Sequence, residues 1–117
     1  MELEITDEDL FRIIKISGDL DVSSVIQLDD QIEESISEGK TRLLFDCQGL
    51  NYISSPGIGV FTSRIEDHEK GLIYLALFGM QPKVFSIFKV LGLDQLLPII
   101  QTKEEAKAFI NDLHQNS

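Results

Sequence analysis

Cysteine, tryptophan and histidine are scarce in this sequence of 117 residues, which has one Cys, no Trp and two His. The single cysteine, Cys47, cannot form a disulfide within the chain, and no Cys and His spacing typical of a zinc site is present. Three prolines and eight glycines exclude a collagen-like chain, and 43% hydrophobic residues exclude a wholly disordered one. The sequence therefore predicts a folded domain with no internal disulfide and no metal site.

Basic residues are also few, with ten Lys and Arg against twenty Asp and Glu, which gives a formal net charge of −10. Binding to nucleic acid phosphates or to an anionic membrane surface requires a basic face, so neither is expected. Residues 1–38 carry twelve acids and two bases, while the remaining 79 residues carry eight of each. This segment either aids solubility or forms a negative face that steers the molecule toward a basic partner.

The sequence lacks any apolar run near the roughly 18 residues of a membrane span. Its first residues, Met1–Glu4, have neither the positive charge nor the apolar stretch of a signal peptide. A chain of this length has room for about one hydrophobic core. We therefore expect a single domain over residues 1–117, without membrane insertion and located in the cytoplasm.

Short apolar stretches alternate with amphipathic segments along the chain. Residues 3–17 suit a β-hairpin with a polar tip at residues 7–9, followed by a turn at residues 18–21. Helices are predicted from Ser23 or Ser24 to Gly39, from Ser55 to Lys70, from Pro82 to Gly92 and from Thr102 onward, with further strands at residues 42–47, 72–78 and 98–100. The order β-β-α-β-α-β-α-β-α predicts an α/β domain with a mostly parallel central sheet, an N-terminal hairpin and about four helices.

The segment Asn51–Val60 is the densest in small residues, and it opens a predicted helix directly after a central strand. Unpaired N–H groups and the helix dipole at such a position favour an anion, so a phosphate could bind there. The segment is not a nucleotide-binding P-loop, because it lacks the Gly-Lys-Ser/Thr sequence and contains no lysine. Alternatively, Gly57 and Gly59 only allow the helix to approach its neighbours closely.

Catalytic chemistry has little support in the sequence. Ser54 and Ser55 lack the Gly-x-Ser-x-Gly pattern of a serine hydrolase. His68 and His114 are expected at the surface, His114 in a fraying tail, so neither is a convincing general base. The acids of residues 1–38 do not have the spacing of a calcium loop. We predict no catalytic residue, no metal ligand and no cofactor.

Four motifs in order carry a resemblance to a known family. They are Gly18-Asp19-Leu20-Asp21 after a strand, Phe45-Asp46 ending the next strand, Tyr52–Gly59 opening a helix, and Leu91–Ile99 near the end. Together they resemble the STAS domain, a family named for sulphate transporters and anti-sigma factor antagonists. Because the chain is a lone domain without a transmembrane part, it is most similar to the bacterial anti-sigma factor antagonists.

The resemblance implies a phosphorylation switch. Family members bind an anti-sigma factor that is also a serine kinase; the kinase phosphorylates a serine at the helix start, and a serine phosphatase resets the switch. The matching residue in this sequence is Ser55, and Asp21 matches an acidic residue of the partner-binding surface. Ser54, Gly57 and Gly59 are expected to shape the same contact.

Two residues depart from the family pattern. Ser54 stands where many members have an acid, which makes it the alternative phosphorylation site, and Pro56 stands where many have Ser, Thr or Ala. Pro56 favours a second hypothesis, in which the domain is a scaffold or regulatory subunit of a transport or stress-signalling complex and is not phosphorylated.

Overall fold

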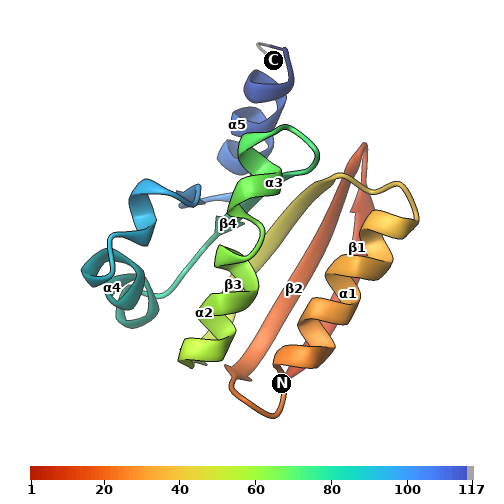
Figure 1. Ribbon diagram of the computed structural model, residues 1–117. Coiled ribbons are helices and arrows are strands. Elements are labelled where there is room, and N and C mark those ends of the chain that lie inside the picture. The colour runs from red at the N-terminus through yellow and green to blue at the C-terminus, as the bar shows by residue number, and fades with distance from the viewer. Residues whose placement is uncertain (116–117) are drawn as a thin grey trace.

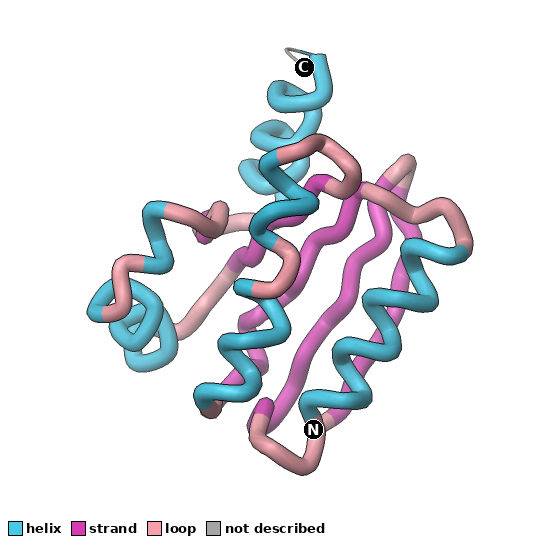
Figure 2. The backbone as a smooth tube through the Cα atoms, in the orientation of Figure 1, coloured by secondary structure: helices cyan, strands magenta, loops and turns pink. Residues whose placement is uncertain are grey.

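The computed structural model describes residues 1–115 as a five-stranded sheet with helices on both faces (Figures 1 and 2). The strands are β1 (Glu2–Glu8), β2 (Phe11–Leu20), β3 (Arg42–Ile53), β4 (Tyr74–Phe78) and β5 (Ile99–Ile100), in the spatial order β1-β2-β3-β4-β5. The helices are α1 (Val25–Ser37), α2 (Ser55–Thr62), α3 (Ile65–Glu69), α4 (Pro82–Val90) and α5 (Lys103–Gln115), with a 3-10 turn at Leu93–Gln95. Only the β1–β2 pair is antiparallel, so the predicted fold class is confirmed.

Two apolar layers hold the helices to the sheet. On one face, residues such as Leu28 of α1, Phe61 of α2 and Phe88 of α4 pack against the buried side chains of β2, β3 and β4. On the other face, Ala106 and Ile110 of α5 cover a smaller cluster. Right-handed crossovers between parallel neighbours place α1, α2 and α4 on the same side, which brings the starts of α1 and α2 to one end of the sheet.

The β2 and β3 strands run further than the sequence predicts. The hairpin turns at Asp9-Leu10, one or two residues later than expected, and β2 continues through residues 18–20. Residues 48–53, expected to leave the sheet, pair with β2 as far as Leu20 and Ile53. Two register irregularities between β2 and β3 lie at residues 15–17 and 18–19 of β2, close to the glycines at positions 18 and 49. Backbone pairing therefore overrides the local turn signals and carries the candidate loop to the end of the sheet.

The helix predicted over residues 55–70 is two helices, because the chain turns at Ser63 and Arg64. The Thr62 hydroxyl donates to the Gly59 carbonyl and the Ser63 hydroxyl to the Val60 carbonyl, so hydroxyl groups compete for the last carbonyls of α2. The backbone N–H of Arg64 bonds to the Phe61 carbonyl, a tighter three-residue step that ends the helix.

His68, expected at the surface, is half-buried in α3. Its Nδ1 accepts a hydrogen bond of 3.1 Å from the backbone N–H of Leu75, which ties α3 to the start of β4. Burial lowers the pKa of His68, because desolvation disfavours the charged imidazolium. His114 is exposed as predicted, but it lies within α5, where its ring packs edge-on to Tyr74 with the centroids 5.8 Å apart.

No helix within residues 1–115 combines the length and apolar character needed to cross a membrane. In the same part of the chain, no three His, Cys, Asp or Glu side chains gather in a way that could hold a metal ion. Cys47 is fully buried in the larger core layer, and burial strongly raises the pKa of its thiol.

Candidate functional site

Ser54 caps α2 and fastens it to the end of β2. Its hydroxyl accepts a hydrogen bond of 3.1 Å from the backbone N–H of Gly57, which satisfies one of the unpaired donors at the helix start. The same hydroxyl donates to the carbonyl oxygen of Leu20 at 3.1 Å, and the Ser54 backbone N–H donates to that oxygen at 2.9 Å. Ser54 is 9% exposed, so its hydroxyl is both enclosed and fully engaged.

Ser55 has the opposite environment one position later. It is the first residue of α2 and is exposed, and Pro56 follows it in the first turn, where a missing N–H is tolerated. The α2 sequence contains no charged side chain, so the partial positive charge of the helix start is not offset within the helix. An exposed hydroxyl at a helix N-terminus can accept a phosphate without disturbing the fold.

Gly57 and Gly59 play different roles, although the sequence presents them alike. A Cβ atom on Gly57 would lie 2.8 Å from the Leu20 carbonyl oxygen and 2.9 Å from Cγ1 of Ile53, closer than real contacts allow. Gly59 is exposed, and a Cβ atom there would have nothing within 4 Å. The lack of a side chain at Gly57 therefore lets α2 pack closely against the end of β2. Gly59 instead leaves part of the α2 surface without a side chain.

Asp21 organises the turn between β2 and α1. Its Oδ1 accepts hydrogen bonds from the Ser23 backbone N–H, the Ser23 hydroxyl and the Ser24 hydroxyl, at 3.1, 2.7 and 3.1 Å. These bonds, the Ser23 hydroxyl first, lower the pKa of the Asp21 carboxyl. The sequence predicted that a serine hydroxyl caps α1, but neither hydroxyl does so. Both donate to the Asp21 carboxylate instead. Asp21 follows Leu20, so this turn lies beside Ser54 and Ser55.

A shallow groove separates α1 from α2. It has a volume of ≈ 300 Å³ and is lined by Val25, Ile26, Asp29, Pro56, Gly59, Val60 and Ser63. Ile26 is 69% exposed, and Val22, in the Asp21 turn, is equally exposed. Neither residue was expected at the site from the sequence. Ile26 could have been found, because it is an apolar residue outside the buried stripe of α1.

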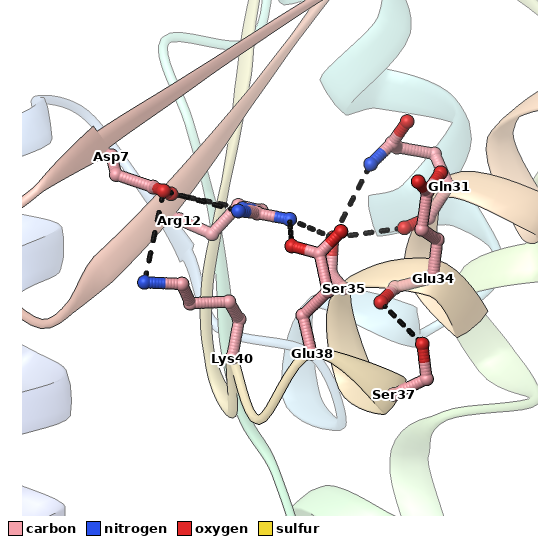
Figure 3. A network of polar contacts seen from close by, with 8 residues as sticks. All are labelled: Asp7, Arg12, Gln31, Glu34, Ser35, Ser37, Glu38 and Lys40. Atoms are coloured by element: carbon pink, nitrogen blue, oxygen red, sulfur yellow. Dashed lines mark hydrogen bonds and ion pairs between the residues drawn. The ribbon is translucent and has the colours of Figure 1, made fainter.

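Ion pairs neutralise much of the acidic segment. Arg12, which is 8% exposed, donates from Nε to Asp7 at 2.9 Å and from Nη1 to Glu38 at 2.7 Å, and Lys40 lies 3.7 Å from Asp7 (Figure 3). The pKa of Asp7 is lowered, chiefly by its hydrogen bonds to Arg12. The network ties the hairpin to the end of α1, so these acids have a structural role.

Other acids of residues 1–38 are also paired. Glu8 contacts Lys107 at 2.8 Å and Lys103 at 3.0 Å, which joins the hairpin tip to α5. Arg64, 9% exposed, bridges α1 to the α2–α3 turn through Asp29 at 3.0 Å and Glu33 at 2.8 Å. Within residues 1–115, the acids of this segment without an ion pair are Glu2, Asp19, Asp21, Asp30 and Glu34. The negative face expected from residues 1–38 is therefore narrower than the count of acids suggests, because Arg12 and bases from the rest of the chain pair with many of them.

Comparison with known proteins agrees with this architecture. Residues 1–106 match the profile of the STAS domain. The chain belongs to the STAS domain family. The anti-sigma-B factor antagonist of Staphylococcus aureus is 23% identical over 104 residues, which cover 89% of this chain and 96% of that protein.

Solved structures show the same fold. An anti-sigma factor antagonist from Mycobacterium paratuberculosis superposes with a TM-score of 0.83 at 18% identity, covering 94% of this chain and 93% of that chain. The Bacillus cell fate determinant SpoIIAA in its phosphorylated form has a TM-score of 0.70 at 22% identity, covering 93% and 99%.

In this STAS domain the structure brings the predicted site residues together around one backbone atom, the carbonyl oxygen of Leu20. Ser54 bonds to that oxygen, Gly57 packs against it, Asp21 follows it in the chain, and Ser55 begins the helix beside it. Gly59 lies one helical turn further along α2 and faces the α1 groove. The sequence predicted this cluster, but only the structure distinguishes the enclosed Ser54 from the exposed Ser55.

Proposed function

We propose that this STAS domain is an anti-sigma factor antagonist, which binds an anti-sigma factor with serine kinase activity and is released when that kinase phosphorylates Ser55. The observation that carries the proposal is the contrast between two adjacent hydroxyls. Ser54 is buried, and its hydroxyl donates to the Leu20 carbonyl and accepts from the Gly57 N–H, whereas Ser55 is exposed at the start of α2. The names of the Staphylococcus aureus and Mycobacterium relatives support the assignment to sigma-factor regulation.

A phosphate on Ser55 would change the surface without unfolding the domain. A phosphoserine adds about 1.5 to 2 negative charges, and the N-terminus of α2 stabilises such charge. The Asp21 turn and the exposed Asp19 are already negative. Added charge there repels acidic groups of a partner and must be desolvated in a packed interface. The expected result is weaker binding with an unchanged fold.

The contact surface for the partner consists of Ser55, the Asp21 turn and the groove between α1 and α2. Its apolar part is formed by Val22, Ile26 and Pro56, and its polar part by Asp21 and Ser55. Such a mixture of exposed apolar groups and a few charges is typical of a protein contact. A partner of this kind presents apolar side chains to the groove and a basic side chain to Asp21.

The proposal is tested by incubating the protein with the serine-kinase-type anti-sigma factor of the same genome and ATP, then mapping phosphate by mass spectrometry. Phosphate is expected on Ser55 in the native protein and in Ser54→Ala, and none is expected in Ser55→Ala. A serine phosphatase of the same system should remove it. Phosphate on Ser54 alone, or on neither serine, would contradict the proposal.

A scaffold function predicts a different pattern. In that case Ser55→Ala and Ser55→Asp both bind the partner as tightly as the native protein does, because no charge change at Ser55 is used. Under the switch hypothesis, Ser55→Ala binds the partner as the native protein does, and Ser55→Asp binds it more weakly. Both substitutions are at an exposed position, so circular dichroism spectra of the two variants should match and any difference in affinity reports the charge.

A further inference from the structure

The C-terminal end of α4 exposes apolar side chains that nothing within residues 1–115 covers. Val90 is 85% exposed and Leu91 is 57% exposed, which is unusual for two adjacent aliphatic residues. They border a hollow of ≈ 290 Å³ that is lined by Ser86, Ile87, Val90 and Leu91. Figure 1 shows α4 on the opposite side of the molecule from α1, so this surface is separate from the α1 side of the Ser55 site.

The charge of α4 differs from that of the chain as a whole. Its nine residues include Lys83 and Lys89 and no acid, in a protein with a net charge of −10. On a helical repeat, Lys83 shares its exposed face with Ser86 and Val90. The surface therefore has an apolar end at Val90 and a basic end at Lys83, and it fits a helix with the reverse polarity.

The chain itself carries such a helix. Ile26, Asp30 and Glu34 follow at steps of four on α1; all three are exposed, and Ile26 is 69% exposed. The α1 sequence contains no basic residue, and within residues 1–115 neither Asp30 nor Glu34 forms an ion pair. The outer stripe of α1 is thus apolar at its N-terminal end and acidic toward its C-terminal end.

We propose that the outer stripe of α1 docks antiparallel onto α4 of a second copy of this chain. With Ile26 in the hollow beside Val90, the spacing of the charges agrees. At a rise of about 1.5 Å per residue, Lys83 lies about 10.5 Å from Val90 along the axis of α4. Along the axis of α1, Asp30 lies about 6 Å and Glu34 about 12 Å from Ile26. Lys83 then faces both acids, while Ile26 contacts Val90 and Leu91.

Charge complementarity selects this arrangement over symmetric ones. Two α4 surfaces in contact would offer no acid to Lys83 and Lys89, and two α1 stripes would bring acids together. The contact is therefore heterologous, so a dimer still has one free α1 stripe on one copy and one free α4 surface on the other. Ile26 also lines the α1–α2 groove, so self-association covers part of the surface proposed for the anti-sigma factor. The contact itself depends on neither phosphorylation nor that partner.

Complementation between two variants tests the proposal by sedimentation equilibrium. The native protein should show an average mass that rises with concentration above the 13.2 kDa of one chain. Ile26→Glu blocks the α1 stripe and Val90→Glu blocks the α4 surface, so each variant alone should remain at the mass of one chain. An equimolar mixture should form a dimer that grows no further, because one variant contributes an intact α4 and the other an intact α1.

Folding of both variants is checked by circular dichroism, and both should fold because the substituted side chains are exposed. Lys83→Glu, a second way to block α4, should weaken self-association at least about tenfold, and adding Glu34→Lys to the same chain should restore it. A native protein that stays at 13.2 kDa up to millimolar concentration would overturn the proposal. So would self-association that Ile26→Glu leaves intact, or a mixture of the two variants that remains monomeric.

Discussion

The carbonyl oxygen of Leu20 accepts two hydrogen bonds from Ser54, one from the backbone N–H at 2.9 Å and one from the hydroxyl at 3.1 Å. This double contact joins the last residue of β2 to the cap of α2. It keeps the Asp21 turn next to Ser55, and it withdraws the Ser54 hydroxyl from solvent. The neighbouring serines therefore differ in both exposure and role.

Ser54→Ala should destabilise the domain by about 1 kcal/mol, within the range of about 0.5–2 kcal/mol for the loss of a helix cap. Ser55→Ala, the matched control, should change the free energy of unfolding by no more than about 0.5 kcal/mol, as exposed positions do. Urea denaturation of the two variants measures the difference. Equal effects would mean that the Ser54 hydroxyl does not hold α2 to Leu20.

Gly57→Ala and Gly59→Ala form a second matched pair in the same helix. A methyl group at position 57 would press on the Leu20 carbonyl and Ile53, so we expect a loss of about 1–3 kcal/mol, typical of overpacking. At position 59 a methyl group meets open space, and replacing Gly with Ala in a helix should stabilise the domain by up to about 1 kcal/mol. Thermal and urea unfolding should therefore shift in opposite directions; a shift in the same direction for both would contradict the close approach of α2 to β2.

Glu8 makes the stability depend on pH in the acid range. Hydrogen bonds from Lys107 and Lys103 lower the pKa of its carboxyl in the folded protein below the ordinary value of 4.5. The ionised form thus stabilises the fold above that value, and this stabilisation is lost as the pH falls through the lowered pKa, from about pH 5 downward. At pH 7 the Glu8→Gln variant should unfold at a lower urea concentration than the native protein. Near pH 3 the unfolding midpoints of the two proteins should be nearly equal.

The Lys107→Met background provides the control for Glu8. Without Lys107, the substitution Glu8→Gln should have a smaller effect at pH 7, because the shorter of the two ion pairs is already absent. Additive effects of the two substitutions would show that Glu8 and Lys107 do not interact in solution.

His68 should titrate below its ordinary pKa of 6.5, because burial disfavours the imidazolium and Nδ1 accepts a hydrogen bond from Leu75. Since the pKa is lowered in the folded state, the associated stabilisation is present above pH 6.5 and is lost as the pH falls through the lowered value. An NMR pH titration should show a neutral ring with its proton on Nε2 at pH 7. A midpoint at or above 6.5 would contradict the bond to Leu75.

Hydrophobic periodicity predicted most of the fold, because the parallel strands contain short apolar runs and the longer helices have apolar stripes. Periodicity could not show that β2 and β3 continue past Gly18 and Gly49, since two irregular pairings override the turn signals there. It also could not show the break at Ser63 and Arg64, where hydroxyl groups bond to carbonyls of α2.

For the site, the resemblance to the STAS family implied that Asp21, Ser54, Ser55 and Gly57 share one surface, and the structure brings them together around Leu20. The sequence did not indicate that Arg12 and Arg64, far apart in the chain, would each bind two acids of the N-terminal segment. Long-range ion pairs leave no local pattern, so the sequence could not show which acids of the negative segment are paired. The structure leaves its negative charge mainly on Asp19 and Asp21 near Ser55 and on Asp30 and Glu34 of α1.

The affinity of the anti-sigma factor for this domain before and after phosphorylation of Ser55 tests the central claim most directly. Titration calorimetry of the unmodified and the enzymatically phosphorylated protein should show a dissociation constant at least about tenfold higher after phosphorylation, equivalent to about 1.4 kcal/mol. The circular dichroism spectra of the two forms should be the same. Equal dissociation constants, with phosphate confirmed on Ser55, would contradict the switch.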